Sequence, residues 1–330
     1  MREFKISRND GGQRLDKFLL KALPALPPSL VYKSIRTKKI KVNRHRAEPN
    51  QMLAEGDVLQ LFLAEHFFPS DSPSQKAVEF ARVKPHLDIV YEDDNLLLLH
   101  KKAGMSVHDD ESGTHDHLLF HIQAYLFQKG EYHPDEEYSF APALCHRIDR
   151  NTDGLVMAAK NAETLRVMSE KIRQREIEKI YLCVLHGVPK ARHAILEAYH
   201  TKDEKTKKVR IYTKNPPPFA KKIKTEYQIL QVKGNLSLAE IRLHTGRTHQ
   251  IRAHMAHIGH ALLGEGKYAQ NRTDKDMGYT YQALCAWKLT FSFASDIKTH
   301  LDYLRGKTFA IDKAQISFLS LFSEDELAPN

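Results

Sequence analysis

Apolar positions in the first part of the chain follow a helical and then an extended spacing. The segment RLDKFLLKAL (14–23) repeats its apolar residues every three or four positions, which is typical of an amphipathic helix. A run of prolines interrupts this pattern, and Ser29 is expected to cap a second helix that continues to Arg36. Residues 39–43 and 58–62 then alternate between polar and apolar positions. The pattern predicts two short helices followed by a small set of strands.

The rest of the chain mixes strand-like and helix-like segments. Residues 88–92 and 96–100 flank the turn Asp-Asp-Asn and predict a β-hairpin. Residues 162–174 have helical spacing, and the segment EKIYLCV (178–184) alternates as a strand. Because the order shows no regular βαβ rhythm, we expect an α+β fold with a mainly antiparallel sheet.

Length and local composition favour two domains. At about 150 residues per domain, a chain of 330 residues is expected to form two. The stretch PSDSPSQK (69–76) has the composition of a linker. We therefore expect a small N-terminal α/β domain, a linker, a larger domain and a C-terminal tail, at residues 1–65, 66–84, 85–308 and 309–330.

Basic residues are concentrated near the N-terminus. The chain has a formal net charge of +9, and residues 1–65 hold 13 basic against 7 acidic residues. Within residues 29–46 there are seven basic residues and no acidic one: Lys33, Arg36, Lys38, Lys39, Lys41, Arg44 and Arg46. A solvated face usually carries both signs, so this stretch favours a polyanionic partner, nucleic acid before an anionic membrane surface. An ordinary basic enzyme is the alternative.

Three cysteines, Cys145, Cys183 and Cys285, stand far apart and form no CxxC pair, which favours a reducing cytoplasm. No apolar run reaches the length of about 18 residues that indicates a membrane span. The charged start of the chain lacks the apolar segment of a secretory signal. We expect a cytoplasmic protein that does not associate with membranes.

The densest candidate for a site is the polar segment HRIDRNTDG (146–154), which leads into an apolar strand-like run. Such a segment is typical of an active-site loop that precedes a buried strand. Asp149, Asn151 and Asp153 also match the first half of a calcium-binding EF-hand loop. The twelfth position of that loop should be a glutamate, and here it is Lys160, which argues against calcium.

A second candidate is the segment HTGRTHQIRAHMAHIG (244–259). Thr248 is expected to cap a helix here, and Arg247 would stand at the helix N-terminus, where backbone N–H groups favour an anion. His254 and His257 have a spacing that could bind zinc. They lack a nearby carboxylate or cysteine, so histidines that only form hydrogen bonds are favoured.

Together these segments resemble the RluA-type pseudouridine synthases. HRIDRNTDG resembles the signature His-Arg-Leu-Asp-x-x-Thr-Ser-Gly, and TGRTHQIR (245–252) matches the motif Thr-Gly-Arg-Thr-His-Gln-Ile-Arg. Lys179-x-Tyr181 resembles the active-site tyrosine strand, and the residues from Lys102 to His108 resemble the Lys-Pro-x-Gly…Val-His segment. Residues 14–62 are similar to a small RNA-binding domain of a ribosomal protein. The chain departs from the family pattern at Ala103, Asp153 and Glu265.

The resemblance implies the pseudouridine synthase fold and the isomerisation of uridine in RNA, without metal, redox cofactor or nucleotide. It assigns the catalytic carboxylate to Asp149, which must be ionised to act as a nucleophile. It pairs Arg252 with Asp149, and it places Tyr181 against the uracil, where it would assist proton removal at C5. Whether Asp149 attacks C1′ or removes a ribose proton stays open. The residues implied to hold the flipped nucleotide or its backbone are His146, Arg147, Thr152, Gly154, Arg247, His249 and Gln250.

Structured RNA is the implied partner, and the basic N-terminal segment suits recognition of a stem by its shape and phosphates. Large-subunit ribosomal RNA is the expected target, with transfer RNA as the alternative, and we expect a monomer. The basic segment 201–224 fits a second RNA contact and a solvated hairpin equally well. Two other classes compete: an RNA-binding protein without catalysis, and a metal-dependent hydrolase built on the histidines.

Overall fold

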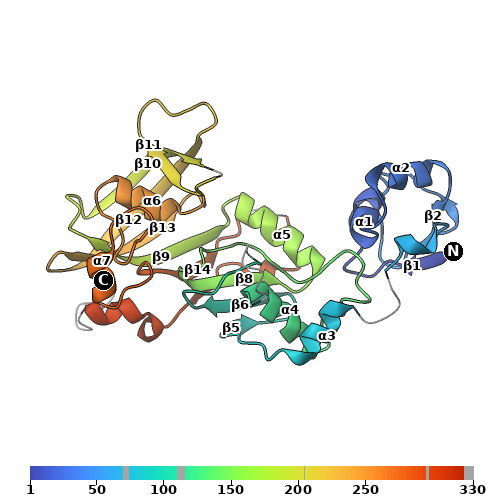
Figure 1. Cartoon of the computed structure of the whole chain (residues 1–330), viewed down its shortest axis with the longest axis horizontal. Coiled ribbons are helices and arrows are strands. Elements are labelled where there is room, and N and C mark those ends of the chain that lie inside the picture. The colour runs from blue at the N-terminus through green and yellow to red at the C-terminus, as the bar shows by residue number, and fades with distance from the viewer. Residues whose placement is uncertain (70–73, 110–115, 204, 295–296, 323–330) are drawn as a thin grey trace.

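The structure, a computed structural model, describes residues 1–69, 74–109, 116–203, 205–294 and 297–322. It contains two separate sheets, one of four strands at the N-terminus and one of 11 strands in the rest of the chain. Figure 1 shows the N-terminal unit beside the larger sheet. No helix of the described residues has the length and apolar character needed to cross a membrane.

The N-terminal unit packs two helices on a small antiparallel sheet with the strand order β1-β4-β2-β3. Its elements are β1 (Arg2–Lys5), α1 (Leu15–Ala22), α2 (Pro28–Arg36), β2 (Ile40–Val42), β3 (His45–Arg46) and β4 (Val58–Leu61). Both predicted helices are confirmed, and Phe18 and Ile35 are buried in the core of the unit. The predicted cap at Ser29 is wrong. The N-cap is Pro27, and Pro28 is the first helical residue, a position that suits proline because no N–H is needed there.

A short segment of the larger part of the chain, residues 137–139, docks onto this unit. The ring of Tyr138 stacks on Phe4 with ring centroids 4.1 Å apart. The carboxylate of Asp10 accepts hydrogen bonds from the backbone N–H and the hydroxyl of Ser139, at 3.0 and 2.7 Å. The unit is therefore held by specific contacts in addition to its covalent connection.

The large sheet has the order β11-β10-β12-β13-β9-β14-β8-β6-β5, with β15 on β14 and β7 on β8. Its pairs are antiparallel except for the parallel pair of β14 and β8, which confirms the α+β class with a mainly antiparallel sheet. The strands are β5 (Ile89–Glu92), β6 (Leu96–Lys101), β7 (Ala143–Leu144), β8 (Asp153–Ala159), β9 (Ile177–His186), β10 (His193–Lys202), β11 (Val209–Tyr212), β12 (Lys221–Lys233), β13 (Leu236–Leu243), β14 (Leu284–Phe291) and β15 (Thr308–Ala310). The α-helices are α3 (Gln75–Arg82), α4 (Leu118–Gln128), α5 (Ala162–Arg173), α6 (Gln250–His257) and α7 (Arg272–Asp276).

Each face of the large sheet has its own apolar core. Helices α3, α4 and α6 contribute to one core, in which Ile122 and Met255 are buried together with Tyr181 of β9. Helix α5 contributes Met168 to the other core, which residues from the C-terminal part complete. Alternation along the central strands supplies both cores, as expected for a sheet covered on two sides.

Two segments that we expected to lie outside the domains contribute to these cores. Residues 75–82 of the predicted linker 66–84 form α3, whose Phe80 is 1% exposed. In the predicted tail 309–330, Phe318 is buried against the second core. Both segments are short and mix apolar residues with polar ones, so the sequence signal was too weak to show this burial. The parts of the linker and tail at 70–73 and 323–330 lie outside the described residues.

Candidate active site

Residues 145–152, which we call the signature loop because they carry most of the segment HRIDRNTDG, connect β7 to the start of β8. Strand β8 (DGLVMAA) is buried almost throughout, so it fixes the end of the loop. A buried lysine, Lys101, holds the other side of the loop: its ammonium donates to the backbone carbonyls of Lys102, Met105 and Arg150, at 2.9, 3.1 and 2.9 Å. Burial lowers the pKa of Lys101 to about 8. These hydrogen bonds join the turn after β6 to the loop that carries Asp149.

Gly154, predicted to bind substrate, has a backbone role instead. Its φ of +129° lies in a region that side chains rarely adopt, and an added Cβ would lie 2.3 Å from the backbone nitrogen of Ala286. Only glycine allows β8 and β14 to approach this closely at the start of their parallel pair.

We expect Gly154→Ala to destabilise the fold by at least about 2 kcal/mol, because the clash is with backbone and adds to the conformational strain. Urea unfolding measures this cost. Gly130→Ala is the matched control, since Gly130 also has a positive φ, +74°, but no atom lies within 4 Å of its added Cβ. Equal costs for the two variants would contradict the close approach as the cause.

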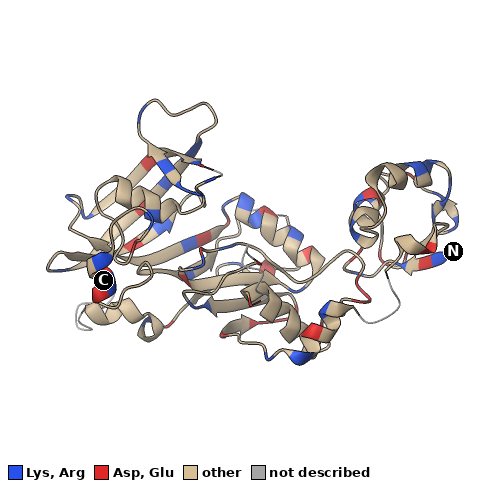
Figure 2. Ribbon diagram, in the orientation of Figure 1, with Lys and Arg blue, Asp and Glu red and all other residues tan. Residues whose placement is uncertain are grey.

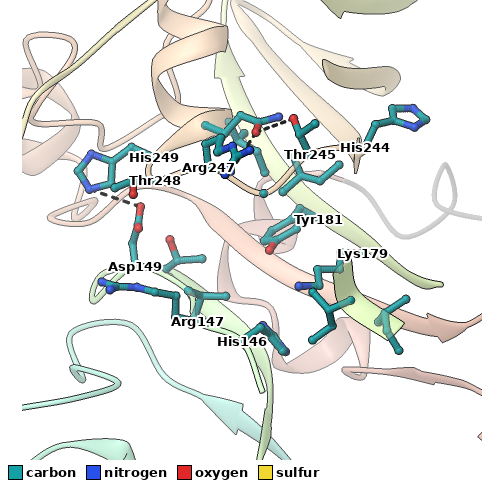
Figure 3. Close-up of a pocket in the computed structure, with 18 of the residues that line it drawn as sticks. His146, Arg147, Asp149, Lys179, Tyr181, His244, Thr245, Arg247, Thr248 and His249 are labelled. Carbon is teal, nitrogen blue, oxygen red and sulfur yellow. Dashed lines mark hydrogen bonds and ion pairs between the residues drawn. The ribbon is translucent and has the colours of Figure 1, made fainter. Parts of the chain in front are cut away.

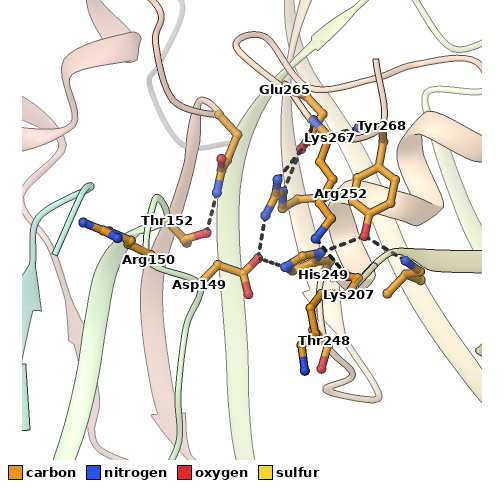
Figure 4. A network of polar contacts seen from close by, with 12 residues as sticks. Asp149, Arg150, Thr152, Lys207, Thr248, His249, Arg252, Glu265, Lys267 and Tyr268 are labelled. Carbon is orange, nitrogen blue, oxygen red and sulfur yellow. Dashed lines mark hydrogen bonds and ion pairs between the residues drawn. The ribbon is translucent and has the colours of Figure 1, made fainter. Parts of the chain in front are cut away.

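Asp149 forms an ion pair with Arg252 across 103 positions of sequence. Arg252 Nη1 donates to Asp149 Oδ2 at 3.1 Å, while Nε and Nη2 donate to the two oxygens of Glu265 at 2.7 and 2.8 Å (Figure 4). Glu265 is fully buried. Burial alone would raise the pKa of Glu265, but its hydrogen bonds with Arg252 lower it below the ordinary value. One guanidinium therefore bridges a buried structural carboxylate and the half-buried carboxylate of the loop.

His249 lies on the other side of Asp149, with Nε2 at 3.8 Å from Oδ2. Its Nδ1 is 2.7 Å from the hydroxyl of Tyr268, and that hydroxyl already accepts from the N–H of Val209 at 3.3 Å. Burial lowers the pKa of His249 to about 4, so the imidazole is neutral at pH 7. Donation from the Tyr268 O–H to Nδ1 places the ring proton on Nε2, the nitrogen that faces Asp149.

The helix start at α6 differs from the prediction in one position. The N-cap is His249, not Thr248, and its φ of +50° is left-handed. Such a conformation in a residue other than glycine is unusual and often occurs at functional sites. It turns the His249 ring toward Asp149 at the point where the backbone enters the helix (Figure 4).

A cavity of about 700 Å³ opens between the signature loop, β9 and the start of α6. Figure 3 shows Tyr181 in its centre and Asp149 on one side. Tyr181 is 8% exposed, and burial together with the Asp149 charge raises the pKa of its phenol, so it stays neutral. The predicted residues that line the cavity are Asp149, Tyr181, Arg252, His146, Arg147, Thr152, Arg247, His249 and Gln250.

Gln250 reaches the cavity wall, but its amide is fully occupied by the protein. Its oxygen accepts from the Thr245 hydroxyl and the Arg247 N–H, at 2.9 and 3.1 Å. Its nitrogen donates to the Lys224 carbonyl and the Thr225 hydroxyl, at 3.1 and 3.0 Å. We therefore assign Gln250 to shaping the loop that presents Arg247, in place of the expected contact with substrate.

The two carboxylates of the calcium interpretation face protein partners, since Asp149 pairs with Arg252 and Asp153 contacts His100 at 3.0 Å. The histidines of the zinc interpretation diverge: His254 is buried against Thr225, and His257 is exposed. Within the described part of the chain, no group of three or more His, Cys, Asp or Glu side chains is placed to hold a metal ion.

Figure 2 marks the basic residues along the ribbon of the N-terminal unit. Lys33 and Arg36 extend from α2, and the others follow through β2 and β3: Lys38, Lys39, Lys41, Arg44 and Arg46. All are exposed except Lys41, which is half-buried. We call this set the basic face.

Sequence reasoning missed three residues of this site. Glu265 carried a signal, because it stands where the resembled family has an aspartate. Lys101 carried another, a charged residue at the end of an entirely buried strand. Tyr268 carried no signal that we can identify, since its contact with His249 depends on how the chain returns after α6.

Comparison with known proteins agrees with this geometry. Residues 95–257 match the family described as RNA pseudouridylate synthase, and residues 13–59 match the S4 domain. The chain is 32% identical over 272 residues to a ribosomal large subunit pseudouridine synthase C of Haemophilus ducreyi, covering 82% of this chain and 80% of that protein. It is 31% identical to the protein of the same name from Vibrio cholerae, covering 84% and 82%. The fold is similar to human RNA pseudouridylate synthase domain containing 4, with a TM-score of 0.55, 21% identity and coverage of 78% and 99%.

Proposed function

The chain belongs to the RNA pseudouridylate synthase family, and we propose that its substrate is a specific uridine of large-subunit ribosomal RNA. The observation that carries the proposal is the ion pair of Asp149 and Arg252 beside Tyr181 in one cavity. The names of the relatives from Haemophilus ducreyi and Vibrio cholerae support the ribosomal target.

The isomerisation breaks the bond between N1 of uracil and C1′ of ribose and forms a bond between C5 and C1′. The hydrogen on C5 leaves as a proton, and N1 gains one, so atoms and charge balance. Asp149, held by Arg252, is the carboxylate that acts at the ribose in our proposal. Tyr181 packs against the uracil. Burial keeps its phenol neutral in the empty site, so we assign it to stacking on the uracil and to hydrogen bonding there.

A uridine in folded RNA must leave its stack to enter this cavity, at a cost of a few kcal/mol. Arg147 and Arg247 line the cavity from opposite elements, the signature loop and the start of α6. We assign them to the backbone of the extruded nucleotide, because guanidinium groups match phosphate geometry. The free cysteines are consistent with the expected cytoplasmic location.

The target is tested by treating ribosomal and transfer RNA from cells that lack this gene with the purified protein, then mapping pseudouridine at nucleotide resolution. We expect conversion at one or a few uridines of the large-subunit RNA. Conversion confined to transfer RNA would contradict the ribosomal target, and conversion of neither would contradict the proposed function.

The basic face is expected to supply much of the RNA affinity. Replacing Lys33, Lys39, Arg44 and Arg46 together with glutamine should weaken binding and reduce the slope of log K against log salt by about 0.7 to 0.9 for each phosphate that is no longer neutralised. These side chains are exposed, so the fold should persist. Filter binding across a salt series measures both quantities.

Lys17→Gln is the control for this variant, since Lys17 is exposed on α1, outside the basic face. It should leave the slope nearly unchanged. A fourfold glutamine variant that keeps the slope of the parent protein would show that the basic face does not bind phosphates.

A further inference from the structure

One end of the cavity has no role in the mechanism above. It lies beyond Tyr181, away from Asp149, and we call it the distal end (Figure 3). The cavity-lining residues on this side come from the signature loop, the turn after α5, β9 and the end of β13: Cys145, His146, Arg175, Glu178, Lys179 and Arg242. A volume of about 700 Å³ suits a drug-sized ligand, which is larger than one uracil ring. The distal end therefore has room for a neighbouring part of the RNA.

Lys179 is one of three cations at this end, beside Arg175 and Arg242. Strand alternation places it on the same side of β9 as Tyr181, and Figure 3 shows its ammonium directed to the space between Tyr181 and His146. Among the described residues no carboxylate forms an ion pair with it. The adjacent Glu178 pairs instead with Arg242, at 3.5 Å. Burial lowers the pKa of Lys179 to about 8, as expected for an ammonium that has lost water without gaining a counter-ion.

The carboxylate nearest to Lys179 in sequence, Glu178, also lines the cavity but is paired with Arg242, and His146 presents a donor. His146 Nε2 accepts from the N–H of Met157 at 3.3 Å, so its proton is on Nδ1, and Nδ1 is buried without a partner in the described structure. Arg175 stands exposed at the rim, just after α5. A desolvated cation that faces a cavity in this way is costly unless an anion enters.

We propose that the distal end binds the phosphodiester of a nucleotide adjacent to the target uridine, with Lys179 as the main contact and Arg175 at the rim. The inference rests on the proposed RNA substrate. A phosphate supplies the negative charge that Lys179 lacks, whereas a base carbonyl would leave the ammonium uncompensated. The flipped uridine is joined to both neighbouring nucleotides by phosphodiester groups. The RNA backbone must therefore pass along the cavity walls where it enters and leaves.

Lys179→Met isolates this interaction. We expect kcat/KM on a synthetic RNA that spans the mapped uridine to fall about tenfold or more, and the salt slope of binding to fall by the amount expected for about one phosphate. Lys179→Arg should restore most of both. The methionine variant should also resist urea better than the wild type, because it removes an uncompensated charge that is half-buried. Lys190→Met is the matched control, since Lys190 is exposed in the loop after β9 and does not line the cavity.

The ligand is identified with RNAs that carry one neutral methylphosphonate at each linkage near the target, and with 4-thiouridine at the target. We expect one methylphosphonate position to lower wild-type kcat/KM as much as Lys179→Met does, with no further decrease when the two are combined. Two results would overturn the proposal. One is that the effects of Lys179→Met and of the methylphosphonate on kcat/KM add at every position, and the other is that Lys179→Met is without further effect only on the RNA with 4-thiouridine. Absence of conversion by the wild type would instead contradict the proposed function itself.

Discussion

The Asp149→Asn variant is expected to form no detectable pseudouridine and to bind RNA at least as well as the wild type. Asparagine keeps the size of the side chain and can still accept a hydrogen bond from Arg252, but it lacks the charge and nucleophilicity of a carboxylate. Losing a group that acts covalently lowers turnover by about 10³-fold or more. Binding should persist, because one negative charge that faces phosphates is removed.

The fold of this variant should be intact, because Glu265 keeps its two hydrogen bonds with Arg252. Asp153→Asn is the control for removal of a carboxylate from the same segment, since Asp153 contacts His100 and not Arg252. It should keep most of the turnover. Full activity of Asp149→Asn, measured as pseudouridine per RNA, would refute the assignment, and joint loss of activity and binding would point to misfolding.

Arg252→Met is expected to lower both turnover and stability. It removes the cation that orients Asp149, which should lower kcat by about 10²-fold or more, by analogy with the loss of other groups that stabilise charge in a site. It also leaves Glu265 buried without its partner, and breaking a buried pair on one side costs about 3 to 5 kcal/mol. Arg252→Lys should recover little of either, because an ammonium cannot bridge two carboxylates with the geometry of a guanidinium.

The double variant Arg252→Met/Glu265→Gln separates the two effects. It removes the uncompensated carboxylate, so the free energy of unfolding should recover in part, while kcat stays low. Urea unfolding and single-turnover kinetics measure the two quantities. Recovery of turnover together with stability would show that Arg252 serves only the fold, and would contradict its role in holding Asp149.

Local patterns predicted most elements of the fold, because each depends on neighbouring residues. Helix α1, the hairpin of β5 and β6, helix α5 and strand β9 follow directly from apolar spacing. Errors arose where tertiary contacts override local preference. The cap at His249 is one such case: the residue has a left-handed φ, and its ring is hydrogen-bonded to Tyr268, which is 19 positions away in the sequence.

The candidate site was predictable only in part for the same reason. The resemblance supplied Asp149, Tyr181 and Arg252, which stand far apart in sequence and which the fold brings to one cavity. It could not show that Arg252 shares its guanidinium with Glu265, because that depends on the depth at which both are buried. Gly154 and Gln250 were predicted as substrate contacts from their motifs, whereas packing and hydrogen bonds within the protein account for both.

The central claim is that this chain isomerises uridine in RNA, and the fate of the hydrogen on C5 tests it most directly. RNA labelled with tritium at C5 of uridine is incubated with the purified protein. Two quantities are then measured, the tritium released into water and the free uracil. The account predicts tritium release equal to the pseudouridine formed, with no free uracil and no release by Asp149→Asn. Wild-type protein that binds this RNA but releases no tritium, or that releases uracil, would contradict it.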